Sequence, residues 1–134
     1  MSHFFVTCAK GLERLLVREL EALGAESCEA RTAGVAVEGA LETAYRACLW
    51  SRIASRVLWP LTEAAAPEAD TLYSMLRAFS WEEHFTVDQT FAVHCTAHRS
   101  PIPNTHYAAL RVKDAVVDRF RDRIGRRPNV DAEA

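Results

Sequence analysis

The chain has 134 residues, of which 49% are hydrophobic and 25% are charged, a composition typical of folded globular domains. This composition excludes a disordered, collagen-like or coiled-coil chain, and the length allows one core or two small ones. The formal net charge of -2 excludes a uniformly basic nucleic-acid binder. No apolar stretch approaches the roughly 20 residues of a membrane span, and the first residues do not resemble a signal peptide. We therefore expect a cytoplasmic protein without a membrane partner.

The first sixty residues predict a ferredoxin-like βαββαβ arrangement. The expected elements are a strand over 3–7, a helix over 10–23, strands over 26–31 and 34–38, a second helix, and a strand over 55–62. One face of the second helix is formed by Leu41, Ala44, Tyr45, Cys48 and Leu49. Aromatic residues at helix and strand spacing are more often core than stacking platforms for bases. We expect core positions for Phe4, Phe5, Tyr45, Trp50, Trp59, Phe79 and Trp81.

An acidic segment broken by a proline, residues 63–70, predicts a linker. It separates a first domain over residues 1–62 from a second over residues 63–134, and a boundary near residue 43 is the alternative. The second domain is expected to contain a helix over 72–79, a strand over 90–96 and a long helix that starts after Asn104 or Thr105. Gly125 ends the long helix, and an extended segment follows. The fold class is therefore α+β.

The long helix predicts one apolar side and one solvated side. The apolar side is formed by Ala109, Val112, Val116, Phe120 and Ile124, and the solvated side by Asp114, Asp118 and Asp122. Arg119, Arg123 and Arg126 follow one border of the apolar side and lead to the Arg126-Arg127 turn. These arginines either follow a phosphate backbone or pair with the nearby aspartates. The sequence alone leaves both interpretations open.

Lys113 lies near the middle of the apolar side of the long helix. Asp114 is not expected to neutralise it, because adjacent helix positions point in different directions. Lys113 either extends its amine to solvent or contacts a phosphate or base. Residues 99–127 as a whole carry eight basic and three acidic residues, which gives this region a positive charge.

No catalytic or metal-binding motif is present. The four cysteines contain no C-x-x-C pair, so reduced thiols are expected. His94, Cys95 and His98 supply metal-ligand types, but a zinc site normally needs three or four converging ligands. No dinucleotide loop, phosphate-binding loop or nucleophile elbow occurs. We therefore expect neither a metal nor catalytic residues in this chain.

Nine segments, in order and across nearly the whole chain, resemble one known family. They are FFVTCAKGLE at 4–13, LEALG at 20–24, GVAVEG at 34–39, LETAYR at 41–46, LWSRIASRVL at 49–58, WEEHF at 81–85, FAV at 91–93, LRVKDAVVD at 110–118 and GRRPNVD at 125–131. The chain is similar to the N-terminal part of bacterial large-subunit ribosomal RNA guanine-N2 methyltransferases.

The resemblance implies a ferredoxin-like domain followed by a THUMP domain, which is an RNA-binding module. It also implies that this THUMP domain is incomplete in its last third and that the S-adenosylmethionine-dependent catalytic domain lies elsewhere in the parent enzyme. The expected partners are large-subunit ribosomal RNA and the missing methyltransferase domains. No cofactor is expected in this chain, and S-adenosylmethionine is expected in the parent.

The predicted RNA-binding residues are basic, with one amide. They are Arg99, Asn104, Arg111, Lys113, Arg119, Arg123, Arg126 and Arg127. Two other functions remain open: a THUMP module for transfer RNA modification, and a ferredoxin-like ligand-sensing or dimerisation domain that binds no RNA. In the second case, the arginines would be paired with acids and binding would not depend on salt.

Overall fold

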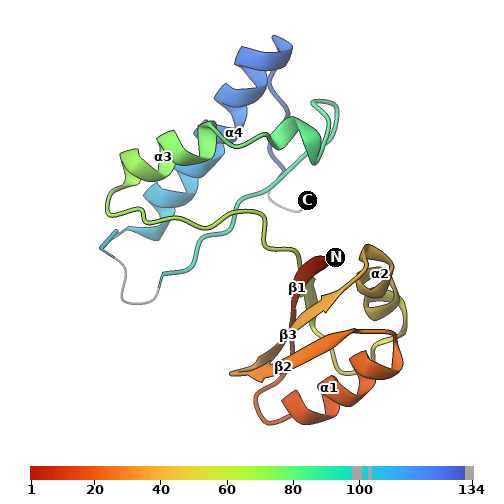
Figure 1. Cartoon of the computed structure of the whole chain (residues 1–134). Coiled ribbons are helices and arrows are strands. Elements are labelled where there is room, and N and C mark those ends of the chain that lie inside the picture. Colours follow the sequence, from red (N-terminus) through yellow and green to blue (C-terminus); the bar gives the residue numbers. More distant parts are fainter. Residues whose placement is uncertain (98–100, 103, 132–134) are drawn as a thin grey trace. The chain divides into compact units, whose positions relative to one another are not determined.

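The structure, a computed structural model, describes residues 1–97, 101–102 and 104–131. The chain divides into two compact units, Met1–Glu63 and Ala64–Ala134, drawn from red to yellow and from green to blue in Figure 1. Each unit has its own helices and its own buried side chains. Helices and an antiparallel sheet together give the α+β fold class predicted from the sequence.

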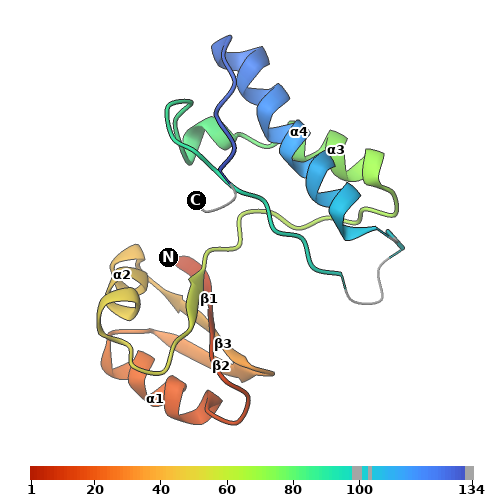
Figure 2. The same cartoon turned by 180° about the vertical axis from the view of Figure 1, so that it is seen from behind.

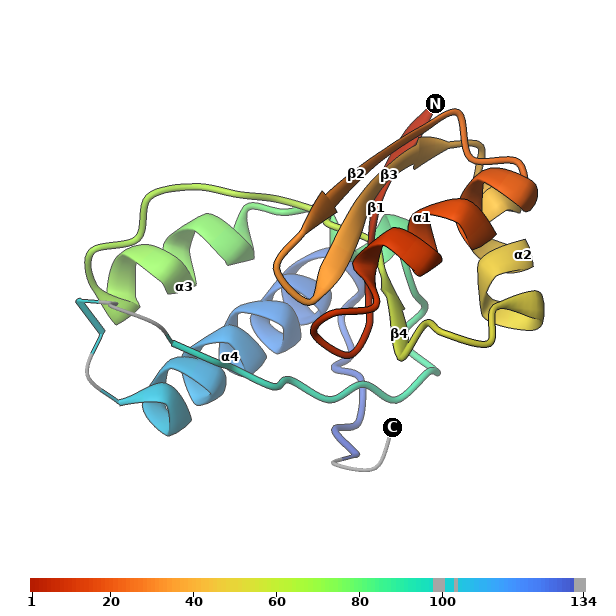
Figure 3. The ribbon, with the colours of Figure 1, turned by 90° about the horizontal axis from the view of Figure 1, so that it is seen from below.

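The first unit is the ferredoxin-like arrangement predicted from the sequence. Its elements are β1 (Ser2–Thr7), α1 (Glu13–Ala22), β2 (Ser27–Arg31), β3 (Gly34–Gly39), α2 (Leu41–Trp50) and β4 (Arg56–Leu58). The strands pair antiparallel in the order β2-β3-β1-β4. Both helices cover the same face of this sheet (Figure 3). The βαββαβ order is thereby confirmed.

The core of the first unit lies between the sheet and the two helices. It is formed mainly by Phe4, Val6, Leu16, Leu20, Val35, Val37, Ala44 and Ala47. Residues at every second position of β1 and β3 are buried because alternate strand residues point to the same face. Leu16 and Leu20 are four residues apart on α1 and are both fully buried. They contribute the largest apolar side chains from the helices to this core.

Helix α2 packs on the sheet through small residues, contrary to the predicted face. Its buried residues are Thr43, Ala44 and Ala47. The larger residues of the predicted face, and two of the predicted core tryptophans, are exposed: Leu41, Tyr45, Leu49, Trp50 and Trp59. The core prediction is therefore wrong for Tyr45 and both tryptophans. Apolar spacing identifies a helix, but it does not show which apolar residues meet the sheet.

Two glutamates of α1 bind backbone amides in neighbouring loops of the first unit. The Glu13 carboxylate accepts from the N–H groups of Gly11 at 2.9 Å and Ala33 at 3.0 Å, and backbone hydrogen bonds hold its pKa below the ordinary value. Burial alone would raise the pKa of Glu19, but hydrogen bonds from Ser51 and Arg52 outweigh it and lower that pKa. These carboxylates join α1 to the β2–β3 turn and to the loop after α2.

The second unit consists of two helices, a short 3-10 turn and extended segments. Its elements are α3 (Ala69–Arg77), η1 (Trp81–Glu83) and α4 (Thr105–Ile124). The Asn104 side chain accepts from the N–H of Tyr107 at 3.1 Å and caps α4, while Gly125 ends α4 with a φ of 83°. Both ends of this helix are as predicted. Within the described residues, no helix is long and apolar enough to cross a membrane.

The core of the second unit lies under α4. Its buried apolar residues are Leu76, Ala108, Ala115, Val116, Val117 and Phe120. The Phe120 ring is 4.9 Å from the Phe85 ring, which is 5.6 Å from the Phe91 ring. The strand predicted over 90–96 is reduced to a single parallel bridge between Phe91 and Val130. The prediction of a regular strand there is wrong, because only that one residue of the segment has a bridge partner in the described part of the chain.

We expect neighbouring leucines of α1 to differ sharply in their effect on stability. Leu16→Ala should lower the free energy of unfolding by about 3 kcal/mol, since it leaves a cavity in the core. Leu15→Ala, at a side chain 51% exposed, should change it by less than about 0.5 kcal/mol. Urea denaturation followed by circular dichroism measures both. Equal effects would contradict the orientation of α1.

Candidate nucleic-acid interface

Helices α3 and α4 lie side by side (Figures 1 and 2) and are joined by polar side chains as well as by the core. The Arg111 guanidinium of α4 stacks 4.1 Å from the centre of the Tyr73 ring of α3, and its Nη2 donates to Asp70 at 3.3 Å. The Tyr73 hydroxyl donates to Asp118 Oδ2 at 2.5 Å. This hydrogen bond, together with partial burial, raises the pKa of Tyr73 above its ordinary value.

Arg77, at the end of α3, extends this row of contacts between the two helices. We call the row formed by Tyr73, Arg77, Asp118 and Asp122 the seam. Its Nη2 and Nε donate to Asp122 Oδ2 at 2.5 and 3.1 Å, and its Nη1 donates to the Tyr73 hydroxyl oxygen at 3.1 Å. The carboxylate of Asp122 raises the pKa of Arg77. The sequence predicted that the acidic side of α4 is simply solvated, but Asp118 and Asp122 instead bind α3. Tyr73 and Arg77 are four residues apart on α3, as Asp118 and Asp122 are on α4, so the two pairs of side chains can meet.

Arg119 of α4 binds Glu82 of the 3-10 turn. Its Nη2 and Nε donate to the two carboxylate oxygens of Glu82 at 2.6 and 3.0 Å, and further contacts reach Ser80 and the Ala78 carbonyl. The hydrogen bond from Arg119 lowers the pKa of Glu82 to about 2. Only 11% of the Arg119 side chain is exposed. The ion pair left open for this residue was with Asp118 or Asp122; in the structure its acidic partner is instead Glu82.

A groove of ≈ 470 Å³ runs between α3 and α4. It is lined by Tyr73, Ser74, Arg77, Ala78, Arg119, Asp122 and Arg123. Three guanidinium groups and a single carboxylate line its walls. Arg119 is paired with Glu82 and Arg77 with Asp122, so Arg123 is the lining arginine that forms no ion pair among the described residues. Guanidinium groups donate two parallel hydrogen bonds to phosphate or carboxylate. The groove is therefore suited to an anion.

The arginines at the end of α4 differ in their partners. Arg126 is 3.3 Å from Asp88 in an exposed ion pair, which contributes little to stability. Arg121 is 3.9 Å from Asp118. Within the described part of the chain, Arg123 and Arg127 form no ion pair within 4 Å. Cations near the C-terminal end of a helix also interact favourably with its dipole, so this end can hold several arginines.

Lys113 is partly buried on another side of α4. Its Nζ lies 3.0 Å from Asp114 Oδ1, so the expectation that Asp114 is unable to neutralise it is wrong. The four-carbon stem of lysine spans the angle between adjacent helix positions. The amine borders a small pocket of ≈ 160 Å³ whose lining includes Val93, Leu110 and Val130. Of the apolar side predicted for this helix, Val116 and Phe120 are buried, Ala109 and Val112 are half-buried, and Ile124 is exposed.

Two further predicted residues, Arg111 and Asn104, do not line the groove. Arg111 is held in the seam by Tyr73 and Asp70, and Asn104 caps α4. Arg99 and His98 lie outside the described residues. Among the residues that are described, no three His, Cys, Asp or Glu side chains come together as metal ligands.

Arg77, Tyr73 and Ser74 of α3 were missed by the sequence analysis. Their signal was present in the spacing, because Tyr73 and Arg77 are four residues apart, as are Asp118 and Asp122. Two helices with complementary groups at the same spacing can pair along one edge. Sequence alone did not show that α3 and α4 are neighbours.

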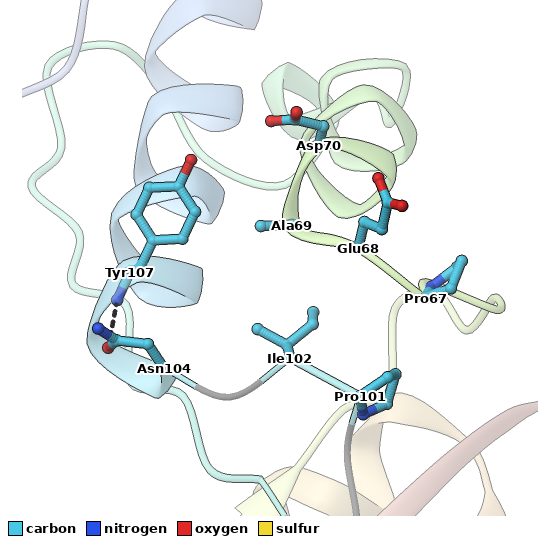
Figure 4. A pocket seen from close by; sticks show the side chains of 8 residues that line it. All are labelled: Pro67, Glu68, Ala69, Asp70, Pro101, Ile102, Asn104 and Tyr107. Carbon is cyan, nitrogen blue, oxygen red and sulfur yellow. Dashed lines mark hydrogen bonds between the residues drawn. The ribbon is translucent and has the colours of Figure 1, made fainter.

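A second pocket of ≈ 340 Å³ lies where α3 and α4 begin (Figure 4). It is lined by Pro67, Glu68, Ala69, Asp70, Pro101, Ile102, Asn104 and Tyr107. Among the described residues, its lining contains two carboxylates and no basic side chain, a combination that is unfavourable for phosphate. Of these two pockets, the groove is therefore the one lined by guanidinium groups.

Comparison with known proteins places this geometry in a family. The model of the RlmL ferredoxin-like domain matches residues 3–58, and the model of the THUMP domain matches residues 66–134, more than half of the chain. The chain belongs to the THUMP domain family. The sequence resemblance is thereby confirmed, and the THUMP match includes α3, α4 and the groove between them.

Relatives of this THUMP chain extend well beyond it. It is 54% identical over 97% of its length to a ribosomal RNA large subunit methyltransferase K/L of Syntrophotalea carbinolica. It is 47% identical over 95% of its length to the protein of the same name in Pseudomonas aeruginosa. The chain spans 18% of the length of either relative.

Two solved structures share the fold of the THUMP chain. One, from Listeria monocytogenes, is described as a predicted N6-adenine-specific DNA methylase. It is 29% identical, with a TM-score of 0.84, over 93% of this chain and 33% of its own. The other, SMU.472, is a candidate methyltransferase crystallised with SAH. It is 25% identical, with a TM-score of 0.86, over 96% of this chain and 35% of its own.

We expect the Arg119–Glu82 pair to stabilise the second unit in a pH-dependent way. Because the pKa of Glu82 is lower when folded, its contribution is present above about pH 4.5 and is lost as pH falls towards 2. Glu82→Gln should cost about 1–3 kcal/mol at pH 7 and much less near pH 2. Thermal unfolding of both proteins across this range measures the difference. A pH-independent difference would contradict the ion pair.

Proposed function

We propose that this chain is the RNA-binding part of a large-subunit ribosomal RNA methyltransferase. Its role is to hold structured ribosomal RNA for an S-adenosylmethionine-dependent catalytic domain elsewhere in the polypeptide. The THUMP match and the names of the relatives at 47% and 54% identity support this role. The observation that carries the proposal is the groove between α3 and α4, which the guanidinium groups of Arg77, Arg119 and Arg123 line.

The groove supports recognition of the RNA backbone. The Nη1 of Arg77 donates to the neutral Tyr73 hydroxyl and carries a second N–H that can donate to a phosphate. Arg123 has no ion pair among the described residues. A phosphate entering between them gains two guanidinium groups, and the Ser74 hydroxyl adds a donor at the same wall. Arg127, in the turn after α4, extends the positive charge beyond the groove. These residues contact phosphates and do not distinguish one base from another.

The other residues predicted to bind RNA have different roles in this proposal. Arg119 orients the groove wall, because its donors are directed to Glu82, Ser80 and Ala78. Arg111 joins α3 to α4, and Asn104 caps α4. Arg126 can exchange the exposed carboxylate of Asp88 for a phosphate at little cost. Lys113, which does not line the groove, and Arg99, which lies outside the described residues, remain predicted contacts.

The proposal assigns the cofactor and the reaction to the catalytic part of the parent enzyme. Relatives named as methyltransferases, and a neighbour solved with SAH, support S-adenosylmethionine in that part. Guanine N2 is the proposed target atom. The proposed division of this chain is a ferredoxin-like domain over 1–62 and a THUMP domain over 63–134, with support from family matches at 3–58 and 66–134. The relatives' names favour ribosomal over transfer RNA.

Binding to large-subunit ribosomal RNA hairpins across a salt series tests the groove. Each of Arg77→Ala, Arg123→Ala and Arg127→Ala should weaken binding and reduce the slope of log K against log salt by about 0.7–0.9. Arg121→Ala is the matched control, since it removes the same charge from α4 outside the groove. Fluorescence anisotropy measures the constants, with transfer RNA as the competing ligand.

Two results would contradict the proposal. One is a folded chain that binds none of the hairpins at low salt. The other is an equal loss of slope for Arg121→Ala and Arg77→Ala, which would mean that only overall charge matters. Tighter binding to transfer RNA would contradict the ribosomal substrate alone.

A further inference from the structure

Arg119 lines the groove, yet its donor positions are occupied by groups of the protein itself. A guanidinium has two edges that each offer a pair of N–H donors, Nε with Nη2 and Nη1 with Nη2. The first edge donates to the two carboxylate oxygens of Glu82, at 3.0 and 2.6 Å. The second edge reaches the Ala78 carbonyl at 3.5 Å and the Ser80 hydroxyl at 3.3 Å. Neither edge is therefore left to hold a phosphate by two hydrogen bonds.

The three arginines that line the groove differ in how far they are available to an anion. Among the described residues, Arg123 forms no ion pair. Arg77 pairs with Asp122 through one edge, and the Nη1 of its other edge meets a neutral hydroxyl. The side chain of Arg77 is 45% exposed, whereas that of Arg119 is 11% exposed. Arg119 is thus the least available of the three, and Glu82 is the acidic residue that binds it.

The 3-10 turn that carries Glu82 is fixed by contacts of its own. The Trp81 indole Nε1 donates to the Leu76 carbonyl at 2.7 Å, and the Trp81 ring is 4.6 Å from the Phe79 ring. The N–H of His84 donates to the Trp81 carbonyl at 2.9 Å and closes the turn. Glu82 is therefore placed on a rigid support, which is the condition for a side chain to hold a partner in one geometry.

Glu82 cancels the charge of Arg119 at neutral pH. The hydrogen bond from Arg119 lowers the pKa of the Glu82 carboxyl to about 2, so this carboxyl is fully ionised at pH 7. Each guanidinium that neutralises a phosphate releases counterions and increases the salt dependence of binding. An arginine that a carboxylate already neutralises adds little to either effect. The groove therefore offers an anion fewer cations than its three arginines supply.

We propose that Glu82 is a positioning residue of the groove, which withholds Arg119 from phosphate. The anion is thereby confined to the wall formed by Ser74, Arg77 and Arg123. This inference rests on the proposed function, in which phosphates of the RNA backbone enter the groove. Arg119 and Arg123 are four residues apart on the same side of α4, so a released Arg119 offers phosphate a second position. Glu82 leaves one position and so fixes the register of the backbone along the groove.

Removal of Glu82 should have opposite effects on folding and on binding. Glu82→Gln removes the charge that holds Arg119, which weakens the fold but adds a guanidinium for phosphate. RNA binding should become about three- to tenfold tighter at low salt, and the slope of log K against log salt should become steeper by about 0.7–0.9. A residue with only a structural role would weaken binding when it is replaced. Fluorescence anisotropy with a large-subunit ribosomal RNA hairpin across a salt series measures both quantities.

Glu83→Gln is the matched control, because it removes the same charge from the same 3-10 turn and leaves the described acceptors of Arg119 in place. It should leave the slope unchanged. The double variant Glu82→Gln/Arg119→Met removes the released guanidinium and should lose the gain in slope. Equal gains for Glu82→Gln and Glu83→Gln, a gain that persists in the double variant, or weaker binding by folded Glu82→Gln would overturn the inference. Circular dichroism verifies that each variant folds.

An NMR titration with inorganic phosphate tests the same inference without RNA, and its first arm needs no variant. In the wild-type chain, the Nε–H signal of Arg123 should shift and that of Arg119 should stay in place. In Glu82→Gln, both signals should shift. A wild-type Arg119 signal that moves as far as that of Arg123, or an Arg123 signal that does not move, would overturn the inference. A wild-type chain that binds no ribosomal RNA hairpin contradicts the proposed function instead, so the two failures are distinguishable.

Discussion

The second unit depends on the hydrogen-bonded seam between α3 and α4. Tyr73 donates to Asp118 while Arg77 binds both Asp122 and Tyr73, so one network includes two residues from each helix. Half-buried carboxylates are costly unless hydrogen-bonded or paired, and the α3 side chains satisfy them. The buried side of α4, which includes Ala115, Val116 and Phe120, sets the rotation of the helix about its axis, and the seam is consistent with the same rotation. This rotation determines which arginines face the groove.

The seam also divides the arginines of α4 into two groups. Arg111 contacts Tyr73 and Asp70, and Arg119 is paired with Glu82, whose pKa is lowered to about 2 by that hydrogen bond. Arg123 and Arg127 remain available at the C-terminal end, where the helix dipole favours positive charge. Charge alone did not reveal this distribution.

The sequence predicted features that depend on local spacing. The βαββαβ order followed from alternating strand and helix patterns, and the ends of α4 followed from Asn104 and Gly125. Prediction from the sequence failed where contacts between distant residues decide which side chains are buried. Tyr45 was placed in the core, although Ala44 and Ala47 meet the sheet instead. The predicted strand over 90–96 has one bridge, from Phe91 to Val130. Arg77 was missed because its partner, Asp122, lies 45 residues away.

The most direct test of the account is an NMR titration of the isotope-labelled chain with a large-subunit ribosomal RNA hairpin. The account predicts that the largest amide and arginine side-chain shifts occur at Ser74, Arg77, Arg123 and Arg127. It also predicts that the Arg119 Nε–H exchanges slowly with solvent both with and without RNA, because Glu82 accepts a hydrogen bond from it. Shifts confined to the first unit, or centred on the pocket at Glu68 and Tyr107, would contradict the account.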